Sequence, residues 1–179
     1  MQKFLLPKET ILYRGTIKGI IPFNTYAYFT TSIEEAKEYG TDFTKENETY
    51  ETQFEKDNRV AKYFTLKLKK DLILGKIEFL NNRVFYKKEN VTEPFKKYME
   101  DLDIIYFNIM KTEEDQDNQE KYNFVLKEKT KYMKEFCKIN EIDGLFHDNS
   151  GDYPDHYEYI IPNIIDISEE IIFCCDKHN

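Results

Sequence analysis

Short apolar segments of strand length set the main limit on how this chain can fold. Residues 62–68, KYFTLKL, alternate apolar and polar side chains, which predicts a half-buried strand. Residues 72–80, LILGKIEFL, predict a second strand. Further short apolar segments predict closing strands at 142–148, 157–162, 163–167 and 170–175. Sheet structure is therefore expected along much of the chain.

Two segments show helical rather than alternating patterns. Residues 90–102 predict a helix that starts near Thr92 and has Pro94 in its first turn. Residues 122–140 carry an imperfect apolar helical face. Strands and helices together predict a mixed α+β architecture. The chain length and its 14 Tyr and 14 Phe suit one domain, spanning 1–179, with a sizeable core.

Net charge and cysteine usage narrow the function classes. The formal charge of −8 disfavours a dedicated nucleic-acid binder or a protein held on an anionic membrane. No signal peptide or transmembrane segment is visible, so we expect an intracellular, soluble protein, or one delivered to a host cytoplasm. Cys137, Cys174 and Cys175 lack metal-ligand spacing, which predicts reduced thiols and no metal site. Cys137 is expected in the core and the other two on a final strand.

Two polar runs interrupt the predicted elements. Residues 41–59 are expected to form either a surface helix or a long loop. Residues 111–121 are expected to form a solvated insertion or loop. The lysines of 66–70 and 127–138 are read as interleaved with acidic residues, and a solvated face explains them better than a nucleic-acid groove.

Three signals that could carry chemistry occur in a fixed order. Arg14 and Gly15 lie at the end of a predicted strand, and Arg offers a planar fork of donors suited to a diphosphate. Residues 26–32, YAYFTTS, predict a strand leading into a helix over 33–40, with Thr31 or Ser32 as N-cap and Gly40 as a stop. Glu158 heads an apolar strand, and a carboxylate can stabilise positive charge at an anomeric carbon.

The three signals lie within blocks that resemble those of a known enzyme superfamily. YRGT, AYFTTSIEEAKEYG and DGLFHDNSGDYPDHYEYIIPNIIDI resemble, in order, the three conserved blocks of the ADP-ribosyltransferases. The resemblance is to the branch built on Arg, Ser-Thr-Ser and Glu, because Arg14 stands where the other branch carries His. It implies two packed, mostly antiparallel β-sheets with flanking helices and NAD in the cleft between them.

The resemblance also implies roles for individual residues. Arg14 would hold the NAD phosphates, and the Gly15 backbone would approach the nicotinamide amide. Thr30, in place of the family's first Ser, would help to orient Glu158, which would bond the nicotinamide-ribose 2′-hydroxyl and stabilise an oxocarbenium-like transition state. NAD would be the substrate and no metal would be needed. The implied NAD site comprises Arg14, Gly15, Thr30, Thr31, Ser32 and Tyr39.

The chain departs from the family pattern in the loop before Glu158. Tyr153 matches the aromatic position of the target-recognition loop, and with Asp155 and His156 it would contact the acceptor. Arginine-modifying members carry Glu where this chain has His156, which argues against arginine as the acceptor. A neutral imidazole can itself act as a base, and Asp155 can reach the same space.

Several alternatives stay open at this point. The activity implied is mono-ADP-ribosylation of an unidentified acceptor, expected to be a protein, with nucleic acid not indicated and no membrane partner. Water as acceptor would give an NAD glycohydrolase, and a silent relative would only bind a nucleotide or a protein. Structurally, Arg14 could be a salt-bridged surface residue, the hydroxyl cluster a helix cap, and Glu158 a solvated strand residue. His147 is expected to be structural, since no second ligand lies at metal spacing.

Overall fold

The computed structural model describes residues 2–16, 19, 25–41, 60–76, 116–148 and 157–177. The first half contains β1 (Lys3–Leu6), β2 (Ile11–Gly15), β3 (Ala27–Phe29), α1 (Ile33–Gly40), β4 (Val60–Leu68) and β5 (Leu72–Lys76). The second half contains α4 (Gln116–Ile139), β6 (Gly144–Asp148), β7 (Tyr157–Ile161) and β8 (Ser168–Lys177). The predicted helix at 90–102 and residues 42–59 of the first polar run lie outside the described residues.

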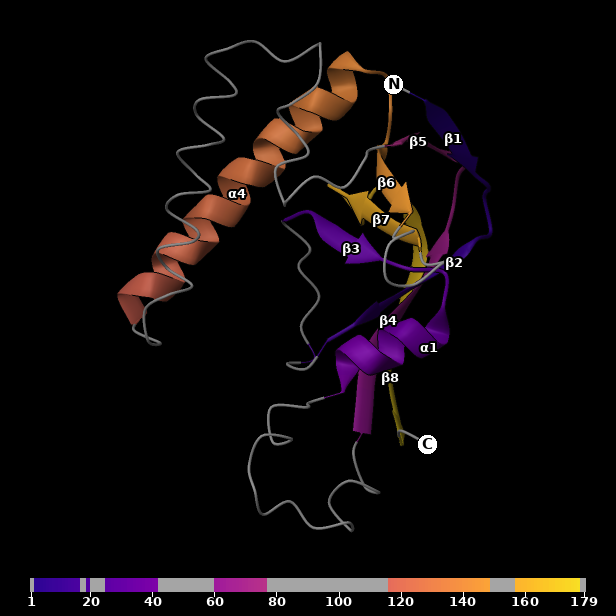
Figure 1. Ribbon diagram of the computed structural model, residues 1–179, viewed down its shortest axis with the longest axis vertical. Helices are drawn as coiled ribbons and strands as arrows, with labels where there is room; N and C mark the ends of the chain where they lie inside the picture. The colour runs from indigo at the N-terminus through magenta and orange to yellow at the C-terminus, as the bar shows by residue number, and fades with distance from the viewer. Residues whose placement is uncertain are drawn as a thin grey trace.

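The described strands form two sheets. One sheet has five strands in the order β1-β5-β6-β7-β3, and the other has three in the order β2-β4-β8. All pairings are antiparallel except that between β5 and β6. Figure 1 shows α4 beside the five-stranded sheet and α1 beside the three-stranded one. The predicted α+β architecture with mostly antiparallel sheets is confirmed at this level.

Within the described residues, one isolated bridge links the edges of the two sheets. The amide of Tyr13 on β2 donates to the carbonyl of Thr30, just after β3, at 2.8 Å, and the amide of Thr30 donates back at 2.9 Å. The strands β7, β3, β2 and β4 are therefore neighbours in that order, although they are far apart in the chain. This order determines which side chains of the candidate site lie together.

The main core lies between the two sheets and follows strand alternation. Leu12 and Leu66, opposite each other on β2 and β4, are fully buried, as are Leu74 on β5 and Ile161 on β7. Phe29 on β3 belongs to the same cluster. Ile11, next to Leu12, is 44% exposed, as period-two alternation requires. The predicted half-buried strand over 62–68 is confirmed within β4, which begins two residues earlier.

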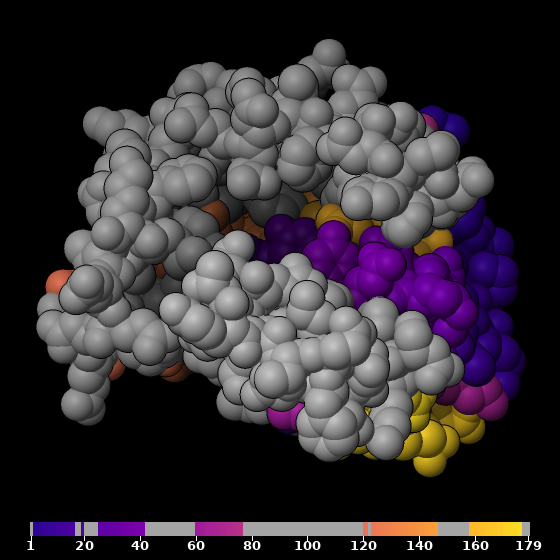
Figure 2. All heavy atoms as spheres, turned by 60° about the horizontal axis from the view of Figure 1, so that its bottom comes forward, coloured from indigo at the N-terminus to yellow at the C-terminus, as the bar shows by residue number. Residues whose placement is uncertain are grey.

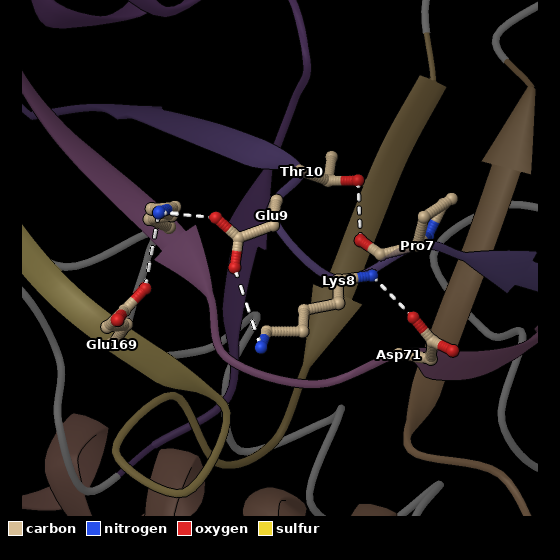
Figure 3. Close-up of polar contacts among 7 residues, drawn as sticks. Pro7, Lys8, Glu9, Thr10, Asp71 and Glu169 are labelled. Carbon is tan, nitrogen blue, oxygen red and sulfur yellow. Dashed lines mark hydrogen bonds and ion pairs between the residues drawn. The ribbon is translucent and has the colours of Figure 1, made fainter.

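The turn between β1 and β2 is fixed by polar contacts, shown in Figure 3. The Lys8 amide donates to the Asp71 carboxylate at 2.6 Å, and the Thr10 hydroxyl donates to the Pro7 carbonyl at 2.6 Å. Glu9 has a positive φ of 70°, an uncommon conformation for a residue other than Gly, and its carboxylate pairs with Lys67. The turn carries the chain from the five-stranded to the three-stranded sheet. The sequence had not predicted β1.

Two sequence predictions are wrong within the described residues. Helix α4 begins at Gln116, inside the run 111–121 that was expected to be a loop or solvated insertion. Glu, Gln and Lys are good helix formers, so high polarity alone does not exclude a helix. The predicted strand at 163–167 is a turn, closed by the Ser168 amide donating to the Ile164 carbonyl at 3.1 Å. Ile164 and Ile167 pack into the core from this turn.

The helix predicted over 122–140 is confirmed within α4, and the cysteines lie where they were expected. Met133, Phe136 and Cys137 form a buried face of α4, as the pattern of 122–140 predicted. Burial raises the pKa of the Cys137 thiol to about 12, so this thiol is protonated at neutral pH and packs as an apolar group. Cys174 and Cys175 lie on β8 as expected, and all three thiols are free. Within the described ranges, no helix has the length and apolar character needed to span a bilayer.

Candidate active site

Arg14 lies near the end of β2, beside the bridge between the sheets. Its side chain is half-buried, and its Nη1 donates to the Tyr28 carbonyl on β3 at 3.0 Å. Carbonyls of alternate residues in an antiparallel strand point to the same side, so the Tyr28 and Thr30 carbonyls both face β2. Beyond the bridge the amide of Thr16 bonds to Lys62 on β4. The Arg14 guanidinium thus hydrogen-bonds the β3 backbone beside the bridge between the two sheets.

Gly15 is required by close packing of α1 against β2. A Cβ at this position would lie 2.2 Å from the Ala36 carbonyl oxygen and 2.7 Å from the Tyr39 Cβ. Gly40, at the end of α1, has a similar role, because its Cβ would lie 2.0 Å from the Lys62 carbonyl oxygen. Both glycines therefore allow α1 to contact the backbone of the three-stranded sheet. Tyr39 lies beside Gly15, with a side chain that is 60% exposed.

The hydroxyl cluster occupies the junction of β3 and α1, as predicted. Ser32 is the N-cap of α1, and its hydroxyl accepts from the Glu35 amide at 3.2 Å. Thr31 is exposed, whereas Thr30 is 6% exposed. Figure 2 shows residues 25–41, coloured purple, as a continuous surface that borders the indigo residues of the N-terminal strands. Of the two predicted N-caps, Ser32 is the correct one.

Glu158 lies on β7 in the row of residues that crosses the site. The β3–β7 register pairs Ala27 with Ile161 and Phe29 with Tyr159, so its continuation by one residue sets Thr30 opposite Glu158. Directly opposed residues of an antiparallel pair have their side chains on the same face. Thr30 also pairs with Tyr13 on β2. The row of register positions therefore runs from Tyr13 through Thr30 to Glu158, whose side chain is half-buried.

Arg14 and Glu158 belong to neighbouring rows. Alternation along β2 directs the Arg14 side chain to the face opposite Tyr13, toward Phe64, its partner on β4. The guanidinium donates a hydrogen bond to the Tyr28 carbonyl on β3. The structure therefore places the strands of Arg14 and Glu158 on either side of β3 and Thr30. Thr30 and Glu158 stand at opposed register positions, whereas the Arg14 side chain starts from the other face.

Four further residues named from the sequence are placed only by register or lie outside the described residues. Tyr153, Asp155 and His156 lie outside the described residues. His147 lies on β6 at the register position paired with Glu158. In the described part of the chain, no group of three potential metal ligands comes together.

Glu35 is a site residue that the sequence interpretation missed. It lies on α1, is 4% exposed, and its Oε2 accepts a hydrogen bond from the Thr30 hydroxyl at 2.5 Å. The spacing Ser32-x-x-Glu35 is that of a capping box, and this signal was present in the sequence. It would have marked Glu35 as a helix-capping side chain, without indicating its contact with Thr30.

Comparison of the chain with protein-family models, with curated proteins and with solved structures gave no match. The interpretation of this site therefore depends on its geometry and on the resemblance of the three sequence blocks.

Proposed function

We propose that this protein is a mono-ADP-ribosyltransferase that cleaves the nicotinamide N-glycosidic bond of NAD and transfers ADP-ribose to an acceptor. The observation that carries the proposal is the order β7-β3-β2, in which β7 bears Glu158, β3 is followed directly by Thr30, and β2 bears Arg14. These residues come from three distant segments of the sequence. The proposed chemistry requires these strands to be neighbours, because a diphosphate and a reacting ribose of one NAD molecule must be bound together.

The proposed reaction assigns each group a separate task. The Arg14 guanidinium binds the diphosphate of NAD through charge-assisted hydrogen bonds. The bond between the ribose C1′ and the nicotinamide nitrogen breaks, and its electron pair leaves with nicotinamide. The Glu158 carboxylate accepts a hydrogen bond from the ribose 2′-hydroxyl and stabilises the positive charge that develops at C1′. The acceptor then donates an electron pair to C1′ and loses a proton.

The acceptor distinguishes the proposed transferase from a glycohydrolase. The segment containing Tyr153, Asp155 and His156 precedes the strand of Glu158 in the chain and is the proposed acceptor-recognition segment. The test is incubation with NAD labelled in its adenine ring, with and without a cell lysate as a source of acceptors. A transferase yields labelled macromolecules together with nicotinamide, whereas free ADP-ribose as the sole labelled product would show that water is the acceptor.

A further inference from the structure

The Thr30 hydroxyl has a buried carboxylate partner that the proposed reaction does not use. Thr30 and Glu35 are 6% and 4% exposed, and the Thr30 hydroxyl donates to Glu35 Oε2 at 2.5 Å. The amide of Ser32 donates to the same hydroxyl at 3.0 Å. Burying a carboxylate is costly unless it is hydrogen-bonded, so this contact strongly constrains the Thr30 hydroxyl.

The arrangement departs from an ordinary capping box. In that motif the glutamate at the third helical position accepts directly from the amide of the N-cap residue. Here the amide of the N-cap, Ser32, donates to the Thr30 hydroxyl instead, and Glu35 accepts a hydrogen bond from that hydroxyl. The Ser32 hydroxyl still caps the helix through the Glu35 amide. The Glu35 side chain is therefore directed to Thr30, although the helix has its cap without it.

Counting donors and acceptors fixes what Thr30 can offer a ligand. A hydroxyl has one proton and two acceptor positions. The proton is given to Glu35, and one acceptor position receives the Ser32 amide. One acceptor position remains and no donor does. Thr30 in this state can receive a hydrogen bond from a ligand hydroxyl, but it cannot donate one to the Glu158 carboxylate.

We propose that Glu35 is a positioning residue, which holds the Thr30 hydroxyl as a hydrogen-bond acceptor for a hydroxyl of the nicotinamide ribose. This inference rests on the proposed function, because NAD supplies the ribose. It assigns Thr30 and Glu158, which the continued β3–β7 register sets opposite each other, to the same sugar. Each would accept a hydrogen bond from a ribose hydroxyl, so the site would select a ligand with a free diol.

The test measures binding of a carbocyclic NAD analogue, whose nicotinamide bond resists cleavage. Thr30→Val removes the hydroxyl with little change in shape. Glu35→Met removes the carboxylate that accepts the hydrogen bond from this hydroxyl. Each variant should weaken binding by about tenfold, the effect of losing one well-placed hydrogen bond. The double variant should bind no more weakly than either single variant, because the proposed effect of Glu35 on ribose binding passes through the Thr30 hydroxyl.

Three controls separate positioning from helix capping. Thr30→Ser keeps the hydroxyl and Glu35→Gln keeps an acceptor oxygen, so both should bind within about threefold of the wild type. Glu38→Met makes the same chemical change at an exposed position of the same helix and should leave binding unchanged. Carbocyclic analogues that lack the 2′- or the 3′-hydroxyl identify the donor. For one of them, wild type and Thr30→Val should bind equally.

The outcomes distinguish this inference from the proposed function. If wild-type protein binds carbocyclic NAD and Thr30→Val binds it equally well, the inference is overturned while the function stands. Additive losses in the double variant, or an equal Thr30→Val loss with every deoxy analogue, would overturn it too. If wild-type protein does not bind carbocyclic NAD, the proposed function fails and the inference falls with it. Thr30→Val and the deoxy analogues decide the matter even if Glu35→Met does not fold.

Discussion

Gly15 on β2 lies so close to α1 that a Cβ at this position would stand 2.2 Å from the Ala36 carbonyl oxygen. The contact is between backbones, which cannot give way as a flexible side chain can. It fixes α1, and with it Ser32 and Glu35, against the strand that carries Arg14. The packing of one glycine therefore determines how two parts of the candidate site lie relative to each other.

Substitution of Gly15 by Ala should destabilise the protein by about 3 kcal/mol, the upper range for forcing an extra carbon into a packed interface. The Ala36 carbonyl and the rest of α1 would have to move away from β2. Urea denaturation of Gly15→Ala measures the effect, and Glu38→Ala, at an exposed position of α1, is the matched control. Equal stability of Gly15→Ala and wild type would show that the close approach does not exist in solution.

The alternation of β2 gives a second prediction. Leu12 is fully buried in the core between the sheets, whereas Ile11 is 44% exposed. Leu12→Ala should lower the free energy of unfolding by about 3 kcal/mol, and Ile11→Ala by less than about 1 kcal/mol. Thermal or urea unfolding of the two variants tests the register directly. A larger loss for Ile11→Ala would mean that β2 presents its other face to the core.

The carboxylate of Asp176 on β8 should make stability depend on pH. Tyr63 donates to it at 2.7 Å and Lys37 lies 3.1 Å away, and these contacts hold its pKa below the ordinary value of 3.8, the hydrogen bond from Tyr63 most strongly. Because the folded pKa is depressed, the stabilisation is complete above the unfolded pKa and is lost as pH falls through the folded one.

Asp176→Asn should therefore be less stable than wild type at neutral pH, and the difference should shrink as pH falls below about 4. Urea unfolding across this range measures it, with Glu38→Gln as an exposed carboxylate control. A stability difference that stays constant between neutral and acid pH would show that the contacts with Tyr63 and Lys37 do not form.

Arg14 is predicted to have both a structural and a binding role. Arg14→Lys keeps the positive charge but loses the planar fork, so the KM for NAD should rise by about tenfold or more. Loss of the hydrogen bond to the Tyr28 carbonyl should also lower stability by about 1 kcal/mol. Steady-state kinetics and urea unfolding of one variant separate the two effects. An unchanged KM with lowered stability would assign Arg14 to the fold alone.

Several elements could be predicted because their local signals agree. β4 follows a clear period of two, and α1 has an N-cap, acidic residues in its first turn and a final glycine. β1 could not be predicted in this way. The sequence KFLL has no alternation of apolar and polar residues, and Lys3, Phe4 and Leu5 are all exposed. Pairing with β5 makes this segment a strand. Residues 163–167 were predicted as a strand because they are apolar, but their apolar side chains reach the core from a turn.

The candidate site was accessible from the sequence only as separate signals. The sequence indicated Arg14, Thr30 and Glu158, and their residue types suggested what each could do. Local patterns did not contain the bridge between Tyr13 and Thr30 that joins the two sheets, because it depends on how the sheets pack. For the same reason, the capping-box spacing of Glu35 gave no hint that its carboxylate bonds to Thr30.

The measurement that tests the central claim most directly is nicotinamide release from NAD, with cell lysate as a source of acceptors, by wild type, Glu158→Gln and Glu170→Gln. Glu170 lies on an exposed position of β8 and makes the same chemical change away from the site. Wild type and Glu170→Gln should release nicotinamide at the same rate, and Glu158→Gln should be at least about 100-fold slower while folding normally. Release by Glu158→Gln at the wild-type rate would contradict the assignment, as would no release by the wild type.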